Sequence, residues 1–499
     1  RDPEMSRGLG DVYKRQIKDK LIDMITFTLA LVLLVVGYWV YGKYVNSLFA
    51  PDSTRKTPAL TMADGVDFIP LPTWKIFMIQ FLNIAGLGPI FGAIMGAQFG
   101  TASYLWIVFG TIFAGAVHDF LSGTLSLRNN GESLPEIIGR YLGSRTKKVA
   151  CVFTVLLMIL VGAVFVSGPA ELLAGMTPSA LDVYFWMVVI FLYYILATML
   201  PIDKIIGRIY PLFAFALLFM AVGILVMLYV KSPALPEMWE GFGTKYEKNP
   251  IFPMMFISIA CGAISGFHAT QSPLMARCIT NEKHCRPIFY GAMVTEGIVA
   301  LIWAAAATYF FQENGIVDKV TGVAYSGAKV ATDISKDWLG AFGGILAILG
   351  IVAAPITSGD TALRSARLIV ADFFHVEQRS IAKRLFICIP IFLVTILLLV
   401  YSFGDAEGFK IIWRYFAWCN QTLSVFTLWA ITVWLVCARK NYWVTLIPAL
   451  FMTCVCATYI LIAPEGLALS AEVAYPVGLC CTLVAAVWFV CWFRRIRSL

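Results

Sequence analysis

Charged residues are scarce in this sequence. Only 14% of the 499 residues are Asp, Glu, Lys or Arg, whereas 60% are apolar. Soluble globular domains carry roughly 25% charged and 45–50% apolar residues, so the composition excludes an ordinary soluble enzyme. Backbone polar groups must be satisfied inside lipid, and repeated apolar runs of about 20 residues therefore predict membrane-spanning helices.

Three chemical signatures are also absent. No Gly-rich phosphate loop ending in Lys-Ser or Lys-Thr occurs, which disfavours an ATP-driven pump and leaves an ion gradient as the energy source. The twelve cysteines form no Cys-x-x-Cys pair and lie mostly in apolar runs, as Cys151 and Cys454 do, so we interpret them as packing residues. The four histidines are scattered, without a paired nucleophile and base or a metal cluster, which disfavours a membrane enzyme. We expect no resident cofactor.

The apolar runs predict an all-α polytopic membrane protein with about 13 transmembrane helices. The expected spans are 24–41, 74–99, 101–127, 149–167, 183–200, 209–230, 251–275, 288–311, 339–361, 385–401, 411–437, 442–462 and 473–493. Residues 1–23 are polar and mixed in charge, and we interpret them as a non-native leader before Met24.

The basic residues indicate the orientation. The net charge of +8 comes from short Lys and Arg clusters between the apolar runs, which indicates topology and lipid contact rather than nucleic-acid binding. If alternate loops carry these clusters on the cytoplasmic side, thirteen spans place the N-terminus outside and the C-terminus in the cytoplasm. We expect a bacterial cytoplasmic (inner) membrane protein with this topology.

Two of the spans are interrupted by Gly and Pro. The second contains NIAGLGPIFG at 83–92 and the seventh contains CGAISGFHATQSP at 261–273. A helix breaks inside a membrane only where neighbours or water satisfy the freed backbone groups, so breaks mark cavities. For either segment alone, close helix packing through small residues is an equal alternative. Both breaks together, five spans apart, are typical of an inverted repeat.

This arrangement resembles the leucine-transporter fold, in which two inverted five-helix repeats (5+5) each begin with a discontinuous helix. The resemblance implies a ten-helix transporter core at 74–437. A peripheral first helix and cytoplasmic loop at 24–73 precede it, and two peripheral C-terminal helices at 438–499 follow it.

Short motifs extend the resemblance to that fold. Asn83 followed by Gly86-Leu87-Gly88 matches the first broken helix of amino-acid symporters, which implies substrate binding by Asn83 and by the amides of Leu87 and Gly88. A second match implies a cation site, for which bound Na⁺ is possible. Its expected ligands are backbone carbonyls and hydroxyls of Leu82, Ala85, Ala354, Thr357 and Ser358.

Longer motifs identify a family. AGAVHDF at 114–120, NNGESLPEIIGRYLG at 129–143, GFHATQSPLMARC at 266–278 and APITSGDTALRSAR at 354–367 resemble the carbon starvation protein A family over essentially 24–499. The resemblance implies a bacterial inner-membrane carrier for pyruvate, or in some members for peptides, that acts under nutrient limitation and is generally driven by protons.

An ionisable residue inside a span is costly and is by default a functional candidate. His268 in the second break is expected to bind substrate or couple protons, with a packing histidine as the alternative. Gln271 and Ser272 are expected to hydrogen-bond a substrate carboxylate or to cap the second half-helix. Asp119 needs a partner and is a candidate for proton coupling, with a structural ion pair as the alternative. His118 is a weaker candidate for proton coupling, because it is expected to point elsewhere on the helix.

Three further carboxylates are ambiguous. Glu171 follows Gly-Pro near the outer face, where it is either a gate for protons or a snorkelling residue. Glu296 is expected to be solvated near the cytoplasmic end, and Asp360 is expected to pair with Arg364 one turn later.

The coupling ion is H⁺ or Na⁺, because family resemblance favours protons while the Thr357–Ser358 pair favours sodium. The sequence thus predicts a symporter for pyruvate or a similar small carboxylate, with a di- or tripeptide transporter as the alternative. A membrane nutrient sensor is a weaker alternative, because the longest polar loops are about thirty residues and too short for a signalling domain.

Overall fold

The computed structural model describes residues 24–65, 67–199, 202–241, 250–319, 324–376, 380–404 and 408–497. The expected leader at 1–23 lies outside these residues. Their regular secondary structure is helical, apart from one isolated bridge between Val317 and Ala324. The prediction of an all-helical fold is confirmed for the described part of the chain.

The helices differ widely in length. Those of twenty residues or more are α10 (Ser144–Ala174), α12 (Ile202–Lys231), α15 (Gly291–Asn314), α16 (Gly327–Phe374), α17 (Ile381–Gly404), α18 (Gly408–Cys437), α19 (Trp443–Ile462) and α20 (Ala471–Arg497). The shorter ones are α2 (Ile25–Trp39), α3 (Tyr41–Phe49), α4 (Pro58–Thr61), α5 (Thr73–Ile84), α6 (Ala93–Gly96), α7 (Thr101–Gly110), α8 (Ala116–Arg128), α9 (Leu134–Leu142), α11 (Val183–Met199), α13 (Phe256–Ser258) and α14 (Gly266–Ala276). Single turns of 3-10 or π geometry are η1 (Gly88–Gly92), η2 (Ala97–Phe99), η3 (Thr111–Gly115), η4 (Met238–Glu240), η5 (Ile251–Met255), η6 (Glu282–His284) and η7 (Arg286–Tyr290).

Ten of the described helical segments are long and apolar enough to cross a membrane, or eleven if one bent pair counts as a single span. That pair is 73–84 with 88–99, bent by 55°. Of the other predicted spans, the fifth is the shorter helix α11, and the seventh is divided between α13 and α14. The protein is therefore a multi-pass membrane protein, while the count of thirteen spans stays a prediction.

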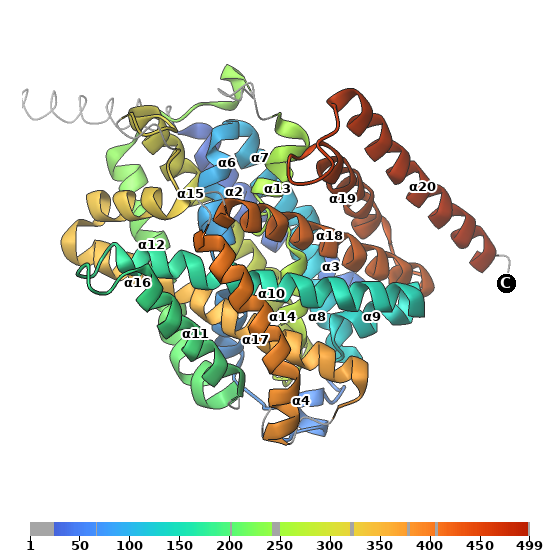
Figure 1. Cartoon of the computed structure of the whole chain (residues 1–499). Coiled ribbons are helices and arrows are strands. Elements are labelled where there is room, and N and C mark those ends of the chain that lie inside the picture. The colour runs from blue at the N-terminus through green and yellow to red at the C-terminus, as the bar shows by residue number, and fades with distance from the viewer. Residues whose placement is uncertain are drawn as a thin grey trace, which may run out of the picture.

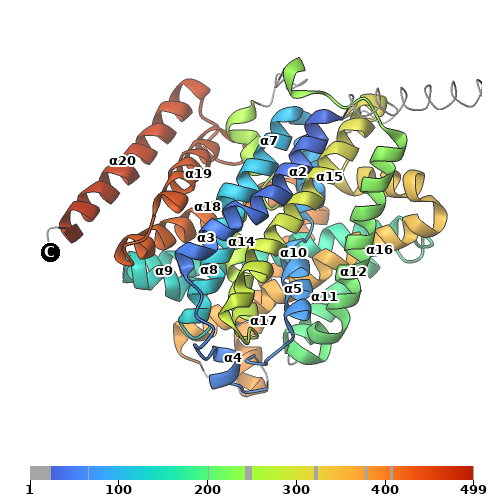
Figure 2. The same cartoon turned by 180° about the vertical axis from the view of Figure 1, so that it is seen from behind.

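The helices that carry the two breaks lie in the interior. α14 packs against α5, α8, α16 and α18, and α10 packs along α16 and α18. Figures 1 and 2 show α10 and α14 near the middle of the bundle, with α20 diverging at its edge. The apolar surface of α20 is mostly exposed, as expected of a helix that faces lipid.

Two local features shape individual helices: a carboxylate at the start of α2 and a glycine kink inside α16. The Glu237 carboxylate accepts hydrogen bonds of 2.8 Å from the amides of Ile25 and Thr26, which places an anion at the positive N-terminus of α2. Gly340 inside α16 has φ 66°, a left-handed conformation that glycine adopts without a steric penalty. The stretch of α16 that can cross a membrane is 343–374, which begins beyond this kink.

Candidate functional site

The first break separates α5 from η1. Residue Ala85 leaves the helix with φ −80° and ψ 55°, and the chain becomes helical again at Gly88. The Ser358 hydroxyl of α16 lies 3.1 Å from the carbonyl oxygen of Leu82 and 2.9 Å from that of Asn83, so it donates to carbonyls freed by the break. α16 therefore supports the end of α5, as a broken membrane helix requires.

The second break lies between α13 and α14, and side chains from distant helices satisfy its backbone. Three of its backbone carbonyl oxygens accept hydrogen bonds of 2.9–3.2 Å from side chains. The Trp106 indole donates to Ile259, the Thr111 hydroxyl donates to Gly262, and the Gln421 amide donates to Ile264. The Asn420 side-chain oxygen accepts from the amide of Phe267 at 2.7 Å and from the Ser265 hydroxyl at 3.0 Å. Asn420 thus caps α14 from another helix, a role that sequence analysis missed.

The two breaks touch each other. A Cβ atom added at Gly88 would lie 2.3 Å from both Cβ and Sγ of Cys261, and one added at Gly262 would lie 3.8 Å from Cα of Pro89. The first contact is far below van der Waals distance, so Gly88 allows the chain to pass against Cys261. In this conformation the two breaks are packed face to face.

Beside the second break lies a cluster of four titratable side chains, all 0% exposed. His118 Nδ1 is 2.7 Å from Asp119 Oδ1, and His268 Nδ1 is 2.8 Å from Asp119 Oδ2. His268 Nε2 lies 3.4 Å from Glu296 Oε2. The cluster joins α14, on one side of the second break, to α8 and α15.

The geometry of the cluster has a consequence for its protons. Each imidazole faces Asp119 through Nδ1, which assigns an Nδ1–H donor to both rings. The approach of His268 Nε2 to Glu296 is favourable only if a further proton lies on one of the two groups. The four side chains therefore form a buried site whose charge changes when one proton is gained or lost.

Three predictions about these side chains are corrected. Glu296 is fully buried rather than solvated, because α15 is covered there by α5 and α8. His118 does not point elsewhere, since its ring bonds Asp119. Asp360 is held by the hydroxyls of Tyr210 at 2.6 Å and Tyr193 at 3.3 Å, while the guanidinium of Arg364 donates to the Ala197 carbonyl.

The other predicted residues lie on α14, at the first break and on α10. Ser272 Oγ donates to the carbonyl of His268 at 3.0 Å, and Gln271 Nε2 donates to Thr270 Oγ1 at 2.9 Å while its Oε1 has no hydrogen-bond partner. Leu87 is buried, and its side chain packs against Gly168 of α10. Glu171 is half-buried near the end of α10.

Among the expected cation ligands, the structure brings Leu82 of α5 into contact with Ser358 of α16. Ser358 Oγ contacts the carbonyls of Leu82 and Ala354, both at 3.1 Å. The Thr357 hydroxyl instead donates within α16, to the carbonyl of Ala354 at 2.7 Å. Ala85 lies at the end of α5, next to this group.

Two amide side chains on α5 are conspicuous. Gln80 and Asn83 are 0% exposed, and neither the oxygen nor the nitrogen of either side chain has a hydrogen-bond partner. A buried polar group without a partner costs about 1–3 kcal/mol, so these amides are expensive for the fold. Asn83 is part of the motif that predicted substrate binding, whereas Gln80 lies outside it.

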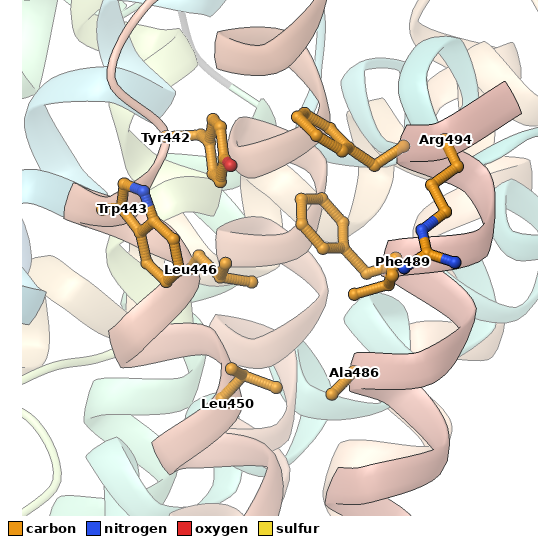
Figure 3. Close-up of a pocket in the computed structure, with 9 residues that line it drawn as sticks. Tyr442, Trp443, Leu446, Leu450, Ala486, Phe489 and Arg494 are labelled. Carbon is orange, nitrogen blue, oxygen red and sulfur yellow. The ribbon is translucent and has the colours of Figure 1, made fainter. Parts of the chain in front are cut away.

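Two cavities in the described part of the chain are lined by residues outside the two breaks. One of about 80 Å³ is lined by residues such as Thr101, Thr308 and Gln312. A groove of about 720 Å³ runs between α19 and α20, where Tyr442, Trp443 and Leu446 face Phe489 and Arg494 (Figure 3). This second groove is apolar and lies at the edge of the bundle.

The sequence matches a known family over most of its length. The profile of the family described as Carbon starvation protein CstA matches residues 23–184, 170–337 and 305–459. The chain belongs to the carbon starvation protein CstA family. The chain is therefore a membrane transporter, and the resemblance noted in the sequence is confirmed.

Relatives of this CstA family chain include one uncharacterized protein and two named transporters. An uncharacterized membrane protein of Haemophilus influenzae is 42% identical over 58% of this chain and 92% of its own length. The peptide transporter CstA of Escherichia coli is 25% identical, over 84% of this chain and 78% of its own. The pyruvate/proton symporter BtsT of E. coli is 29% identical, but over only 55% of this chain and 48% of its own.

Solved structures share the fold. A histidine-to-alanine variant of the Eremococcus coleocola manganese transporter superposes on this chain with a TM-score of 0.57 at 11% identity. The superposition covers 87% of this chain and 99% of that one. Among the residues described here, no group of three or more His, Cys, Asp or Glu side chains is arranged to hold a metal ion. At this level of identity the likeness shows the fold alone.

Proposed function

We propose that this CstA family chain is a proton-coupled symporter that imports pyruvate or a similar small carboxylate under carbon starvation. The observation that carries the proposal is the buried cluster of His118, Asp119, His268 and Glu296, in which the approach of His268 to Glu296 is favourable only with an added proton. A proton acceptor enclosed beside a broken helix is what an alternating-access symporter needs at the centre of the membrane.

The proposed architecture is the leucine-transporter-like 5+5 repeat with thirteen spans, an outside N-terminus and a cytoplasmic C-terminus in the inner membrane. α5 with η1 and α13 with α14 are the two discontinuous helices at matching positions. Their contact at Gly88 and Cys261 closes the centre in this conformation, and separation of the breaks opens the substrate site.

In this mechanism the substrate carboxylate binds the amides of Leu87 and Gly88 at the N-terminus of η1, where the helix dipole favours an anion. Gln271 and Ser272 of α14, on the second broken helix, are proposed as further hydrogen-bonding groups for the substrate. His268 and Asp119 then serve the proton rather than the substrate, because both His268 nitrogens are directed at carboxylates. Glu171, near the end of α10, is proposed as an access residue for protons.

Proton binding couples to movement through charge. With the added proton, His268 lies between Asp119 and Glu296 and holds α14 against α8 and α15. Loss of that proton leaves two buried carboxylates facing a neutral imidazole, and the cost of the unbalanced charge favours separation of the helices. Proton binding therefore favours the conformation in which α14 is held against α8 and α15.

Two alternatives rest on specific observations. The E. coli relative named a peptide transporter aligns with 84% of this chain, which supports a di- or tripeptide substrate. The contact of Ser358 with Leu82 and Ala354 supports a sodium site instead of proton coupling. Sodium would be the coupling ion, bound by the carbonyls of Leu82, Ala85 and Ala354 and the hydroxyls of Thr357 and Ser358.

The test is uptake of labelled pyruvate into proteoliposomes under an imposed proton gradient, with sodium replaced by choline. We expect uptake by the native chain and loss of gradient-driven uptake in Glu296→Gln, with pyruvate exchange retained because the substrate site is intact. Glu313→Gln, which alters an exposed carboxylate at the other end of α15, is the matched control and keeps the uptake. Uptake that disappears without sodium would instead favour the sodium site, and uptake of peptides but not pyruvate would favour the peptide substrate.

A further inference from the structure

Gln80 and Asn83 stand apart from the other buried amides of this chain. They are three residues apart on α5 and so share one helical face, directly before the first break. All four of their polar side-chain atoms lack hydrogen-bond partners, although both side chains are fully buried. Buried side-chain amides in proteins nearly always have partners, so this pair requires an explanation.

The amides that support the second break behave differently. Asn420 and Gln421 of α18 are also fully buried, and both bond backbone or hydroxyl groups of that break. Their structural role is clear. At the first break the hydroxyl of Ser358 binds the backbone carbonyl of Asn83, and the Asn83 side chain takes no part.

The position of α5 suggests what the pair binds. α5 packs against α14, which carries His268 and Gln271, and against α15, which carries Glu296. Gln271 Oε1 likewise has no partner. Side-chain amide atoms without hydrogen-bond partners are therefore found on both broken helices, close to the helices that carry the titratable cluster.

We infer that Gln80 and Asn83 form a substrate subsite that recognises the carbonyl oxygen beside the carboxylate of a small 2-oxo acid. The inference rests on the proposed function and specifies its substrate class. The carboxylate binds the amides of Leu87 and Gly88 beyond the break, while the side-chain NH₂ groups of Gln80 and Asn83 donate to the neighbouring oxygen. Neutral amides suit this role, because they orient an acceptor without adding charge to the membrane interior.

The experiment measures ligand binding by the melting temperature of the full-length protein in detergent. The variants are Gln80→Met and Asn83→Leu, which approximate the shape of the native side chains without their polar atoms, and Asn420→Leu is the matched control. The ligands are pyruvate, propionate, which lacks the 2-oxo group, and alanylalanine.

We expect Gln80→Met and Asn83→Leu to melt at or above the native temperature, because they remove buried groups without partners. Asn420→Leu should melt lower, because it removes bonds to the break. Both α5 variants should bind pyruvate at least about tenfold more weakly, while their affinity for propionate stays near the native value.

Three outcomes would overturn the inference. Melting temperatures that fall as far as that of Asn420→Leu would assign the amides a structural role. Native pyruvate affinity in both variants would remove them from the site while leaving the proposed function intact. A native chain stabilised by alanylalanine but not by pyruvate would contradict the proposed pyruvate substrate and the 2-oxo acid class together.

Discussion

At the scale of single residues, Asp119 bonds two imidazole rings at once, His118 through Oδ1 and His268 through Oδ2. Sequence analysis predicted that a carboxylate at this depth needs a partner, because an isolated charge is costly in a membrane. It did not identify His268, which is 149 residues away. It misjudged Glu296, because distance along a helix does not reveal which neighbours cover that helix.

Asp119→Ala should therefore damage the protein more than the loss of either histidine. Removing one partner of a buried charged network costs about 3–5 kcal/mol, since the remaining groups keep their desolvation cost. We expect a lower unfolding temperature and no gradient-driven uptake, measured on the same purified sample. His118→Gln keeps the Asp119–His268 contact and should retain measurable uptake, and equal damage by the two substitutions would contradict this hierarchy.

At the scale of elements, the breaks could be predicted but their supports could not. Gly and Pro mark both interruptions in the sequence, and the structure places them where the runs NIAGLGPIFG and CGAISGFHATQSP occur. The groups that satisfy the second break are Trp106, Thr111, Asn420 and Gln421, each more than 150 residues away along the chain. Local pattern holds no information about such partners, because they are brought together only by tertiary packing.

The contact of the two breaks predicts the outcome of a glycine substitution. Gly88→Ala would place Cβ 2.3 Å from Cys261, and overpacking of this kind costs about 1–3 kcal/mol or more. We expect reduced thermal stability and uptake, both restored toward the native values in the Gly88→Ala, Cys261→Gly double variant.

The control for this double-mutant cycle is Gly175→Ala. The Cβ atom added there would meet only ordinary contacts of 3.6 Å, so we expect the substitution to be tolerated. Restoration by the second substitution measures the coupling between the two breaks directly. Additive effects of the two changes would show that the breaks do not press on each other in the membrane.

At the scale of the whole molecule, α19 and α20 relate differently to the rest of the bundle. α19 packs against α18, η5 and α13, and Phe451 of α19 contacts the rings of Trp106 and Phe256. α20 packs mainly along α19, and the groove between them is open to the surroundings (Figure 3). The sequence predicted both as peripheral helices, because apolar periodicity alone does not separate a helix that supports a break from one that faces lipid.

Truncation of the chain therefore has different consequences at two positions. Ending the chain after Ser470 removes α20, which holds few buried side chains, and we expect a folded protein that retains at least about half of the native pyruvate uptake. Ending it after Lys440 also removes α19 and uncovers α13 at the second break, so uptake should be lost. Both proteins are compared in proteoliposomes at equal amounts of inserted protein. If the chain that ends after Ser470 loses uptake, α20 has a role in transport that its packing within one chain does not explain, such as contact with a second copy.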